Sequence, residues 1–260
     1  MESDQEAHRL LMKTNTESVK RQAAWAGISE GMRVLDVGCG SGAAAQALAQ
    51  LVGPTGELVG LDISSERLDI ARNHNDMSWV SFKQHDITQP YLDNRPFDAV
   101  WSRFFLEYFN NNQEQVILNS VASLRSGGIV CLGDLDHNCL NHYGHNQKIQ
   151  QTIEEIMRLL QDNHNFDPYA GRRLYGHLYH LGFTEIACIL EAHHLIYGEA
   201  NDVDLFNWRT KVEVAAVRSG SLFSAYEGDL QAFKEDVTRF LKDPEGFTYT
   251  PLIIVRGVKQ

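Results

Sequence analysis

Five consecutive residues, Gly38-Cys39-Gly40-Ser41-Gly42, form a glycine-rich stretch between a short apolar run and an alanine-rich run of helical character. Glycine lets a ligand touch bare backbone, and the N–H groups at the start of a helix point at that ligand. Gly38, Gly40 and Ala43 satisfy the spacing of the dinucleotide fingerprint, and Asp62 lies about 20 residues beyond, where a ribose partner is expected. The stretch therefore predicts a nucleotide-type cofactor, and its spacing leaves NAD(P) open.

Acidic side chains near this stretch favour a cationic cofactor over a pyrophosphate. Asp36 stands two residues before the first glycine, where its carboxylate would repel a pyrophosphate in a partly dry cleft. Asp36, Asp62 and Asp86 each lie at the end of an expected strand, and the carboxyl ends of parallel strands meet at one sheet edge. S-adenosylmethionine carries an ammonium, a sulfonium, ribose hydroxyls and an adenine amine, but no phosphate. The charge pattern therefore favours S-adenosylmethionine, with NAD(P) as the alternative.

The same residues resemble the first motif of the class I S-adenosylmethionine-dependent methyltransferases. Val34-Leu35-Asp36-Val37-Gly38-Cys39-Gly40-Ser41-Gly42 carries that motif in a strand–turn–helix context. The similarity covers about residues 30–135 and the terminal pair of strands. Further segments that share it, each a weaker signal alone, are Leu61-Asp62-Ile63-Ser64, Gln84-His85-Asp86-Ile87, Phe97-Asp98-Ala99-Val100 and Leu124-Arg125-Ser126-Gly127-Gly128.

The resemblance implies roles for residues near the methionine part of the cofactor. Asp36 is expected near the ammonium group, and Arg103 near a carboxylate of the cofactor or of the methyl acceptor. A helix-capping or loop role is the alternative for Asp36 and for Asp62. The backbone around the methionine part is expected to come from Gly38, Cys39, Gly40, Gly42 and Ser102.

The nucleoside part of the cofactor is expected to contact two further strand ends. By the resemblance, Asp62 accepts hydrogen bonds from the ribose hydroxyls, and Ile63 packs on the adenine. Asp86 accepts one from the adenine amine, and Ile87 flanks the ring. Aspartate and serine also favour turns at strand ends, so a purely structural role is the alternative for Asp86 and Ser102.

Acid–base and aromatic residues follow the fourth and fifth expected strands, where the methyl acceptor would lie. Methyl transfer is an in-line displacement on an activated carbon, so a general base is needed only for a weakly acidic hydroxyl or a protonated amine. Glu107 and His137 are the candidate catalytic bases, with a solvated helix acid and a capping histidine as the alternatives. Phe104, Tyr108 and Tyr143 are the candidate acceptor contacts, with core packing as the alternative.

Histidines and cysteines form no metal-binding motif in the sequence. His193 and His194 are adjacent in an expected strand, where neighbours point to opposite faces, and no two histidines have HxxxH spacing. The four cysteines form no CxxC pair. We therefore expect no metal site, and a reducing compartment.

The elements that must position these residues alternate between strand and helix from about residue 30 to 135. This alternation predicts an α/β fold with a Rossmann-like, doubly wound, seven-stranded, mostly parallel sheet and an antiparallel last strand. We expect one domain over residues 1–260, with a core over about 30–135, 172–198 and 248–260. The segments at about 1–26, 136–170 and 199–247 are expected to form a helical lid.

Composition narrows the range of partners. The chain has 260 residues, with 23 Lys and Arg against 34 Asp and Glu, so its net charge is −11. It has no basic footprint for nucleic acid or an anionic membrane. Its acidic first residues are unlike a signal peptide, and no apolar run has membrane-spanning length. We expect a cytoplasmic monomer or homodimer.

Together these features predict an enzyme that moves a methyl group from S-adenosylmethionine to O, N or C of a small, partly apolar molecule and releases S-adenosylhomocysteine. Aromatic residues in the expected lid favour a small acceptor over a polymer. Two alternatives stay open. One is an NAD(P)-dependent oxidoreductase, and the other is a regulatory or scaffold protein that binds S-adenosylmethionine without transferring its methyl group.

Overall fold

The computed structural model describes residues 15–260, and its centre is one eight-stranded sheet. Pairs among the first five strands are parallel, whereas β8 runs antiparallel to β5, β6 and β7. This confirms the predicted α/β fold with its antiparallel last strand. The sheet has one strand more than the seven predicted, namely the short β6. In spatial order the strands are β3 (Val80–Gln84), β2 (Glu57–Asp62), β1 (Arg33–Val37), β4 (Phe97–Arg103), β5 (Leu124–Leu135) and β8 (Phe247–Val258), on which both β7 (Thr184–Tyr197) and β6 (His142–Tyr143) pair.

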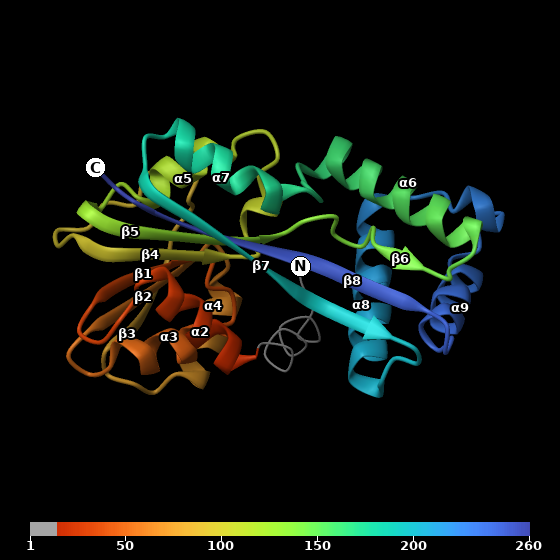
Figure 1. The fold of residues 1–260 in the computed structure, drawn as a ribbon, viewed down its shortest axis with the longest axis horizontal. Helices are drawn as coiled ribbons and strands as arrows, with labels where there is room; N and C mark the ends of the chain where they lie inside the picture. The colour runs from red at the N-terminus through yellow and green to blue at the C-terminus, as the bar shows by residue number, and fades with distance from the viewer. Residues whose placement is uncertain (1–14) are drawn as a thin grey trace.

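Helices cover both faces of this sheet, as Figure 1 shows. Successive strand residues point to opposite faces, so Trp101 packs in the cluster on one face and Val100 in the cluster on the other. The core therefore has three layers, and the carboxyl ends of the parallel strands meet at one edge. One face is covered by α2 (Thr16–Ala26), α3 (Ala45–Val52) and α4 (Ser65–His74), and the other by α5 (Gln113–Ser120) and α7 (Ala170–His180).

Helix α2 belongs to this core, whereas the sequence predicted a lid for residues 1–26. Val19, Ala23 and Ala26 are fully buried in the cluster that also contains α3 and the sheet. Asn15 caps the helix by accepting a hydrogen bond from a backbone N–H of its first turn, and Gly27 ends it in the left-handed conformation. The rest of that predicted lid segment, residues 1–14, lies outside the described residues.

Three further helices, here called the helical group, pack together beside the sheet: α6 (Gln147–His164), α8 (Asp202–Ser219) and α9 (Leu230–Leu241). Their apolar faces meet in a cluster separate from the two on the sheet, and they lie together on the right of Figure 1. Each of these three helices starts after a residue whose side chain accepts a hydrogen bond from a backbone N–H, namely Asn146, Asn201 and Asp229.

Within residues 15–260, no helix is both long and apolar enough to cross a bilayer.

Strands β7 and β8 connect the sheet to the helical group. β8 pairs with β5 through Leu252–Val258, and its first two residues pair with β6. β7 follows β8 from end to end, with a register shift between Ala192 and His194. The two strands therefore form one continuous ribbon across both parts of the molecule, as Figure 1 shows.

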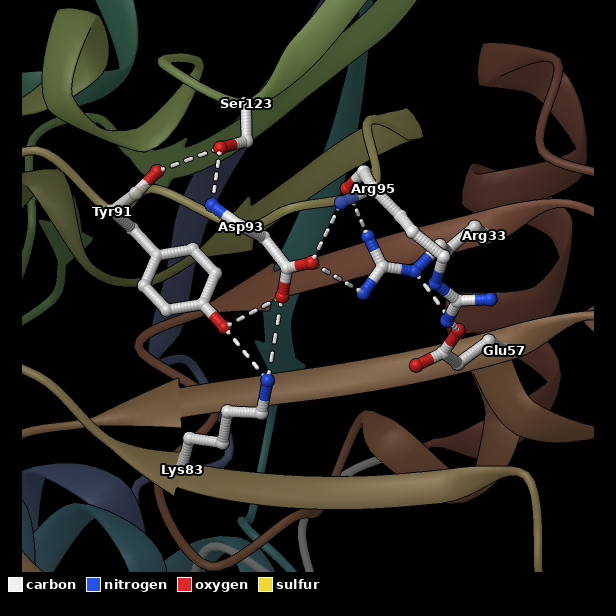
Figure 2. A network of polar contacts seen from close by, with 7 residues as sticks. All are labelled: Arg33, Glu57, Lys83, Tyr91, Asp93, Arg95 and Ser123. Carbon is white, nitrogen blue, oxygen red and sulfur yellow. Dashed lines mark hydrogen bonds and ion pairs between the residues drawn. The ribbon is translucent and has the colours of Figure 1, made fainter.

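A polar network around Asp93, shown in Figure 2, joins the connection before β4 to the amino ends of β1 and β2. Asp93 Oδ1 lies 3.2 Å from the Arg33 guanidinium, and Oδ2 accepts hydrogen bonds from Lys83 at 3.3 Å and from the Tyr91 hydroxyl at 3.2 Å. The N–H of Asp93 donates to Ser123 Oγ at 2.8 Å, which also links the network to the start of β5. The remaining members, paired with each other, are Glu57 and Arg95.

Candidate functional site

A cavity of about 240 Å³ lies where the ends of β1 and β4 face the helical group. Its wall on the sheet side consists of the glycine-rich stretch and the residues that end or follow β4, and α6 and α8 contribute its other side. The structure thus brings candidates for the methionine part of the cofactor together with candidates for the methyl acceptor. The sequence-predicted residues that line the cavity are Asp36, Gly38, Cys39, Gly40, Arg103, Phe104, Glu107 and Tyr108.

Two glycines of the stretch between β1 and α3 have different roles. Gly40 has a φ of +54° and open space where a Cβ would lie, so its backbone borders the cavity without obstruction. Gly42 has a φ of +77°, and an added Cβ would lie 3.0 Å from the Cβ of Ala71 and 2.9 Å from Asn75 Nδ2. Gly42 is outside the set of described residues that line the cavity, so the structure gives it a packing role against α4 where we expected a cofactor contact.

Asp36 brings a buried carboxylate into the cavity wall at the end of β1. It is 2% exposed, and no donor within residues 15–260 reaches its Oδ2 atom. Burial and, second, the charge of Asp62 raise its pKa from 3.8 to about 7. A buried carboxylate oxygen without a partner favours a ligand that supplies a donor or a positive charge beside it.

Asp62, at the end of β2, is oriented by the backbone around it. Its Oδ2 accepts a hydrogen bond from the N–H of Gly40 at 2.9 Å, and its Oδ1 accepts one from the N–H of Ser64 at 2.9 Å. An ionised carboxylate has about four lone-pair sites, so acceptor capacity is left for ribose hydroxyls. Asp62 thus ties the glycine-rich stretch to the start of α4.

The other candidates for the nucleoside lie in the loops after β2 and β3. Ile63 is 63% exposed, whereas Ile87 is buried in the core. Asp86 is exposed, and the N–H of Thr88 donates to it at 2.9 Å, which lowers the pKa of Asp86. The local role of Asp86 is therefore a turn, and the adenine contacts of Asp86 and Ile87 stay predictions.

The end of β4 contributes Ser102 and Arg103, which have different surroundings. Ser102 Oγ donates to the carbonyl of Val37 at 3.0 Å and so joins β4 to β1. Arg103 lines the cavity, with its guanidinium carbon 4.3 Å from the centre of the Phe104 ring, and no acceptor in residues 15–260 reaches its Nε. Burial lowers the pKa of Arg103 to about 10, so it stays charged at neutral pH.

Glu107 is a buried acid in the cavity wall, so the alternative of a solvated helix acid is wrong. It lies in the short turn η1 (Leu106–Tyr108), and its Oε2 accepts a hydrogen bond from Asn138 Nδ2 at 2.9 Å. Asp134 of β5 lies beside it, and the N–H groups of Phe105 and Glu107 each donate to Asp134 Oδ2 at 3.2 Å. Burial and then the charge of Glu107 raise the pKa of Asp134 well above its ordinary value.

Aromatic rings complete the acceptor side of the cavity. Tyr108 lines the cavity and is 40% exposed. Its ring centre lies 5.9 Å from that of Phe166 and 5.8 Å from the guanidinium carbon of Arg218. The Phe104 ring packs against the His193 ring at a tilt of 52°, with ring centroids 4.7 Å apart. Phe104 and Tyr108 both line the cavity, and their contact with the methyl acceptor stays a prediction.

Sequence reasoning missed several residues that line the cavity. Lys211 donates from Nζ to Asn138 Oδ1 at 2.5 Å, so these two residues meet across the helical group and the segment after β5. Asn138 has no signal in the sequence, because its place depends on the turn that follows β5. The cavity residues of α8 do have a signal in the sequence, because spacings of three, four and seven residues place side chains on one face of a helix. These residues are Lys211, Val214, Ala215 and Arg218.

His137 and Tyr143, predicted as a base and an acceptor contact, lie outside the set of described residues that line the cavity. His137 has a φ of +49°, and its ring meets Tyr169 edge to face at 5.0 Å. Tyr143 is 73% exposed on β6. Asn138 and Cys139, which follow His137 directly, do line the cavity, so the difference at His137 is local: its left-handed backbone places its ring against Tyr169. Tyr143 lies apart because β6 pairs with the first residues of β8.

The adjacent histidines of β7 correct a second expectation. The register shift between Ala192 and His194 interrupts strand alternation, and the ring centroids of His193 and His194 are 4.4 Å apart. His142 has a structural environment, because burial lowers its pKa to about 4 and its Nε2 lies 2.9 Å from the carbonyl of Cys139. Within residues 15–260, no group of three or more His, Cys, Asp or Glu side chains is arranged to hold a metal ion.

The strand order, the antiparallel β8 and the glycine-rich stretch beside two aspartates define the class I S-adenosylmethionine-dependent methyltransferase architecture. A family model described as a methyltransferase domain matches residues 28–181, which is more than half of the chain. The chain therefore belongs to this methyltransferase family.

Curated relatives match part of the chain. The arsenite methyltransferase of Aquipseudomonas alcaligenes is 30% identical over 116 residues, which cover 41% of this chain and 33% of the relative. The ubiquinone biosynthesis O-methyltransferase of Coxiella burnetii is 31% identical over 112 residues, which cover 42% of this chain and 46% of the relative. The chain thus spans less than half the length of these two relatives.

A solved structure shares the fold over nearly the whole chain. The crystal structure of the YcgJ protein from Bacillus subtilis superposes with a TM-score of 0.60 and 16% identity. The match covers 95% of this chain and 99% of that chain. At this level of identity the similarity shows a common fold.

Proposed function

We propose that the protein transfers the methyl group of S-adenosylmethionine to O, N or C of a small, partly apolar molecule and releases S-adenosylhomocysteine. The observation that carries the proposal is the buried Oδ2 of Asp36, which has no donor within residues 15–260 and lies in the cavity wall. An ammonium group would supply the missing donor. A pyrophosphate would instead meet a buried acid, which disfavours the NAD(P)-dependent alternative.

The residues present fit this cofactor. Asp36 would hold its ammonium group and Arg103 its carboxylate, and the unobstructed backbone of Gly40 would allow close approach. Asp62 would accept the ribose hydroxyls, and the exposed side chain of Ile63 would cover the adenine. When bound there, the cofactor supplies a methyl carbon that its positively charged sulfur activates towards attack.

The chain itself would contribute position, exclusion of water and a proton acceptor. Apolar side chains of the helical group, among them Met157, Leu160 and Val214, line the cavity and keep it poor in water. An acceptor atom held about 3 Å from the methyl carbon gains rate from its position alone. Glu107 would take the proton of an acceptor hydroxyl or ammonium, and the hydrogen bond from Asn138 directs its Oε2.

Calorimetric titration tests the cofactor assignment. We expect S-adenosylhomocysteine to bind and NADH not to bind. Asp62→Ala should weaken binding of S-adenosylhomocysteine by about 1–3 kcal/mol, because it removes charge-assisted hydrogen bonds to the ribose. Asp69→Ala is the control, since Asp69 is an exposed partner of Arg72 on α4. Binding of NADH alone would favour an oxidoreductase, and an unchanged affinity in Asp62→Ala would contradict the ribose assignment.

Transfer of a labelled methyl group separates an enzyme from a scaffold protein. The protein is incubated with S-adenosylmethionine labelled on the methyl group and with extracts of small molecules. We expect a labelled product together with an equal amount of S-adenosylhomocysteine. Binding without a labelled product in any extract would favour the scaffold alternative. The cytoplasmic location, the monomeric or homodimeric state and the lack of a nucleic-acid partner stay predictions from composition.

A further inference from the structure

Four residues of α8 form a stripe with a positive charge at each end. Lys211, Val214, Ala215 and Arg218 all line the cavity, and their spacing places them on one face of the helix. Lys211 and Arg218 are two turns apart, which is about 10 Å along the helix axis. Val214 and Ala215 between them leave an apolar strip. The helical group thus presents a cation–apolar–cation surface to the cavity.

Neither cation of the stripe has an acidic partner within residues 15–260. Lys211 donates to a neutral amide oxygen at 2.5 Å, and the guanidinium carbon of Arg218 lies 5.8 Å from the centre of the Tyr108 ring. Another cation of the helical group is paired, because Lys234 of α9 lies 2.8 Å from Glu213 of α8. In a chain of net charge −11, two positive side chains without acidic partners on one helix face of the cavity would suit an anionic ligand.

These cations are also distinct from the residues that the cofactor would engage. Arg103 ends β4, on the same side of the cavity as the glycine-rich stretch, where the carboxylate of the cofactor accounts for it. Lys211 belongs to the helical group and connects to the proposed base, because Asn138 accepts a hydrogen bond from Lys211 and donates one to Glu107 Oε2 at 2.9 Å. The stripe therefore faces the acceptor end of the cavity.

We propose that the methyl acceptor is an organic anion, whose apolar body lies along Val214 and Ala215 and whose carboxylate or phosphate group is held by Lys211 and Arg218. The inference rests on the proposed function, because it names the substrate class of the same site. Arginine offers two parallel N–H donors that match a carboxylate or a phosphate, and lysine adds a mobile point charge. An anion bound at the stripe would supply the negatively charged partner that Lys211 and Arg218 lack within residues 15–260.

Matched charged and neutral probes test this inference by calorimetry on the protein saturated with S-adenosylhomocysteine. The probes are 4-phenylbutyrate, its primary amide and 3-phenylpropyl phosphate. We expect at least one anion to bind about tenfold or more tightly than the amide, since charge-assisted hydrogen bonds are about twice as strong as neutral ones. The preference should shrink by about threefold or more in Lys211→Met and in Arg218→Met, and vanish in the double variant. The tighter anion tells whether a carboxylic acid or a phosphate ester is the natural source of the charge.

Two controls separate charge from folding. Arg209→Met changes an exposed cation on the same helix, outside the described residues that line the cavity, and should leave the preference unchanged. Lys211→Arg keeps the positive charge and should keep the preference. All variants should bind S-adenosylhomocysteine as the wild type does, which shows that a lost preference in the methionine variants does not come from unfolding.

Three outcomes would overturn the inference: equal binding of amide and anions by the wild type, no binding of any probe, or a preference that survives in the double variant. Its failure is distinct from failure of the proposed function. If S-adenosylhomocysteine binds but no anion is preferred, only the anionic acceptor is wrong. If S-adenosylhomocysteine does not bind, the proposed function fails, and the same probes on the protein without it still decide about Lys211 and Arg218.

Discussion

Asp36 lies where its ionised form is disfavoured. It is buried beside Asp62, one of its oxygens has no donor within the described residues, and its pKa is raised to about 7. The folded protein therefore holds a proton that the unfolded chain releases above about pH 4. Stability from this group is present below that pH and is lost as the pH rises towards 7. A residue suited to a cationic cofactor thus destabilises the ligand-free protein at neutral pH.

Replacement of this acid tests the opposition between stability and binding. Asp36→Asn should raise the free energy of unfolding near pH 8 by up to about 4 kcal/mol, the equivalent of about three pH units, and change it little near pH 4. The same variant should bind S-adenosylhomocysteine more weakly, because an amide cannot pair with the ammonium group. Urea unfolding at both pH values and calorimetry measure the two effects. Equal stability of variant and wild type near pH 8 would contradict the raised pKa.

Glu107 combines a proposed role in proton transfer with an effect on its neighbour. Glu107→Gln removes the charge that raises the pKa of Asp134, so Asp134 ionises more readily and the protein should become more stable at neutral pH. Methyl transfer to a hydroxyl or ammonium acceptor should slow by about 10²–10⁴-fold, with the affinity for S-adenosylhomocysteine unchanged. Steady-state kinetics and urea unfolding check both results, with Glu235→Gln, which changes an exposed glutamate on α9, as the control. An unchanged kcat would show that Glu107 is not the base.

Among the elements, the connection between β3 and β4 is held by the network of Figure 2. Burial opposes ionisation of Asp93, but the N–H of Arg95 and the charge of Arg33 outweigh it and lower its pKa to about 2. A lowered pKa means that the stability from this carboxylate is present above about pH 4 and is lost as the pH falls towards 2. The network therefore stabilises the fold across the neutral range.

Loss of this carboxylate should affect folding and leave the site intact. Asp93→Ala should reduce the free energy of unfolding at neutral pH by about 1.5–3 kcal/mol, because Arg33 and Lys83 lose their charged partner. The difference from the wild type should shrink near pH 2, where Asp93 is protonated. Urea unfolding measures it, and Asp162→Ala, which breaks an exposed pair with Arg158, should cost less than about 1 kcal/mol. A cost for Asp93→Ala no larger than this control would contradict the role of the network.

The elements differ in how far they were predictable. Strands and helices between residues 30 and 135 are short apolar runs, turn residues and helical runs in regular alternation, so local pattern was sufficient for them. His137 was misplaced because its left-handed backbone places its ring against Tyr169, and Tyr143 because β6 pairs with β8; no local pattern contains these contacts. The rings of His193 and His194 were misplaced because a register shift interrupts the alternation. The stripe on α8 could have been predicted from the sequence, since helix geometry alone places residues spaced by three, four and seven on one face.

At the scale of the whole molecule, charge is distributed in a way that the net value of −11 hides. Asp36 and Asp62 lie at the sheet edge by the cavity, whereas Lys211 and Arg218 lie on the wall formed by the helical group. Under the two proposals, the ammonium of the methyl donor meets Asp36, and the anionic group of the acceptor meets Lys211 and Arg218. The two ligands also attract each other across a cavity that is poor in water. One acidic chain thus offers complementary surfaces to partners of opposite charge.

The ribbon of β7 and β8 limits how the cavity can open. Because both strands run without interruption from the sheet into the helical group, that group cannot swing about a flexible loop as a separate body. Its movement has to deform the ribbon. The pairing of β7 with β8 shifts register at Thr184–Ala187 and again at Ala192–His194, opposite Pro251, which has no N–H to donate. Both parts of the molecule line the cavity, so a change in the twist of the ribbon would change the width of the cavity.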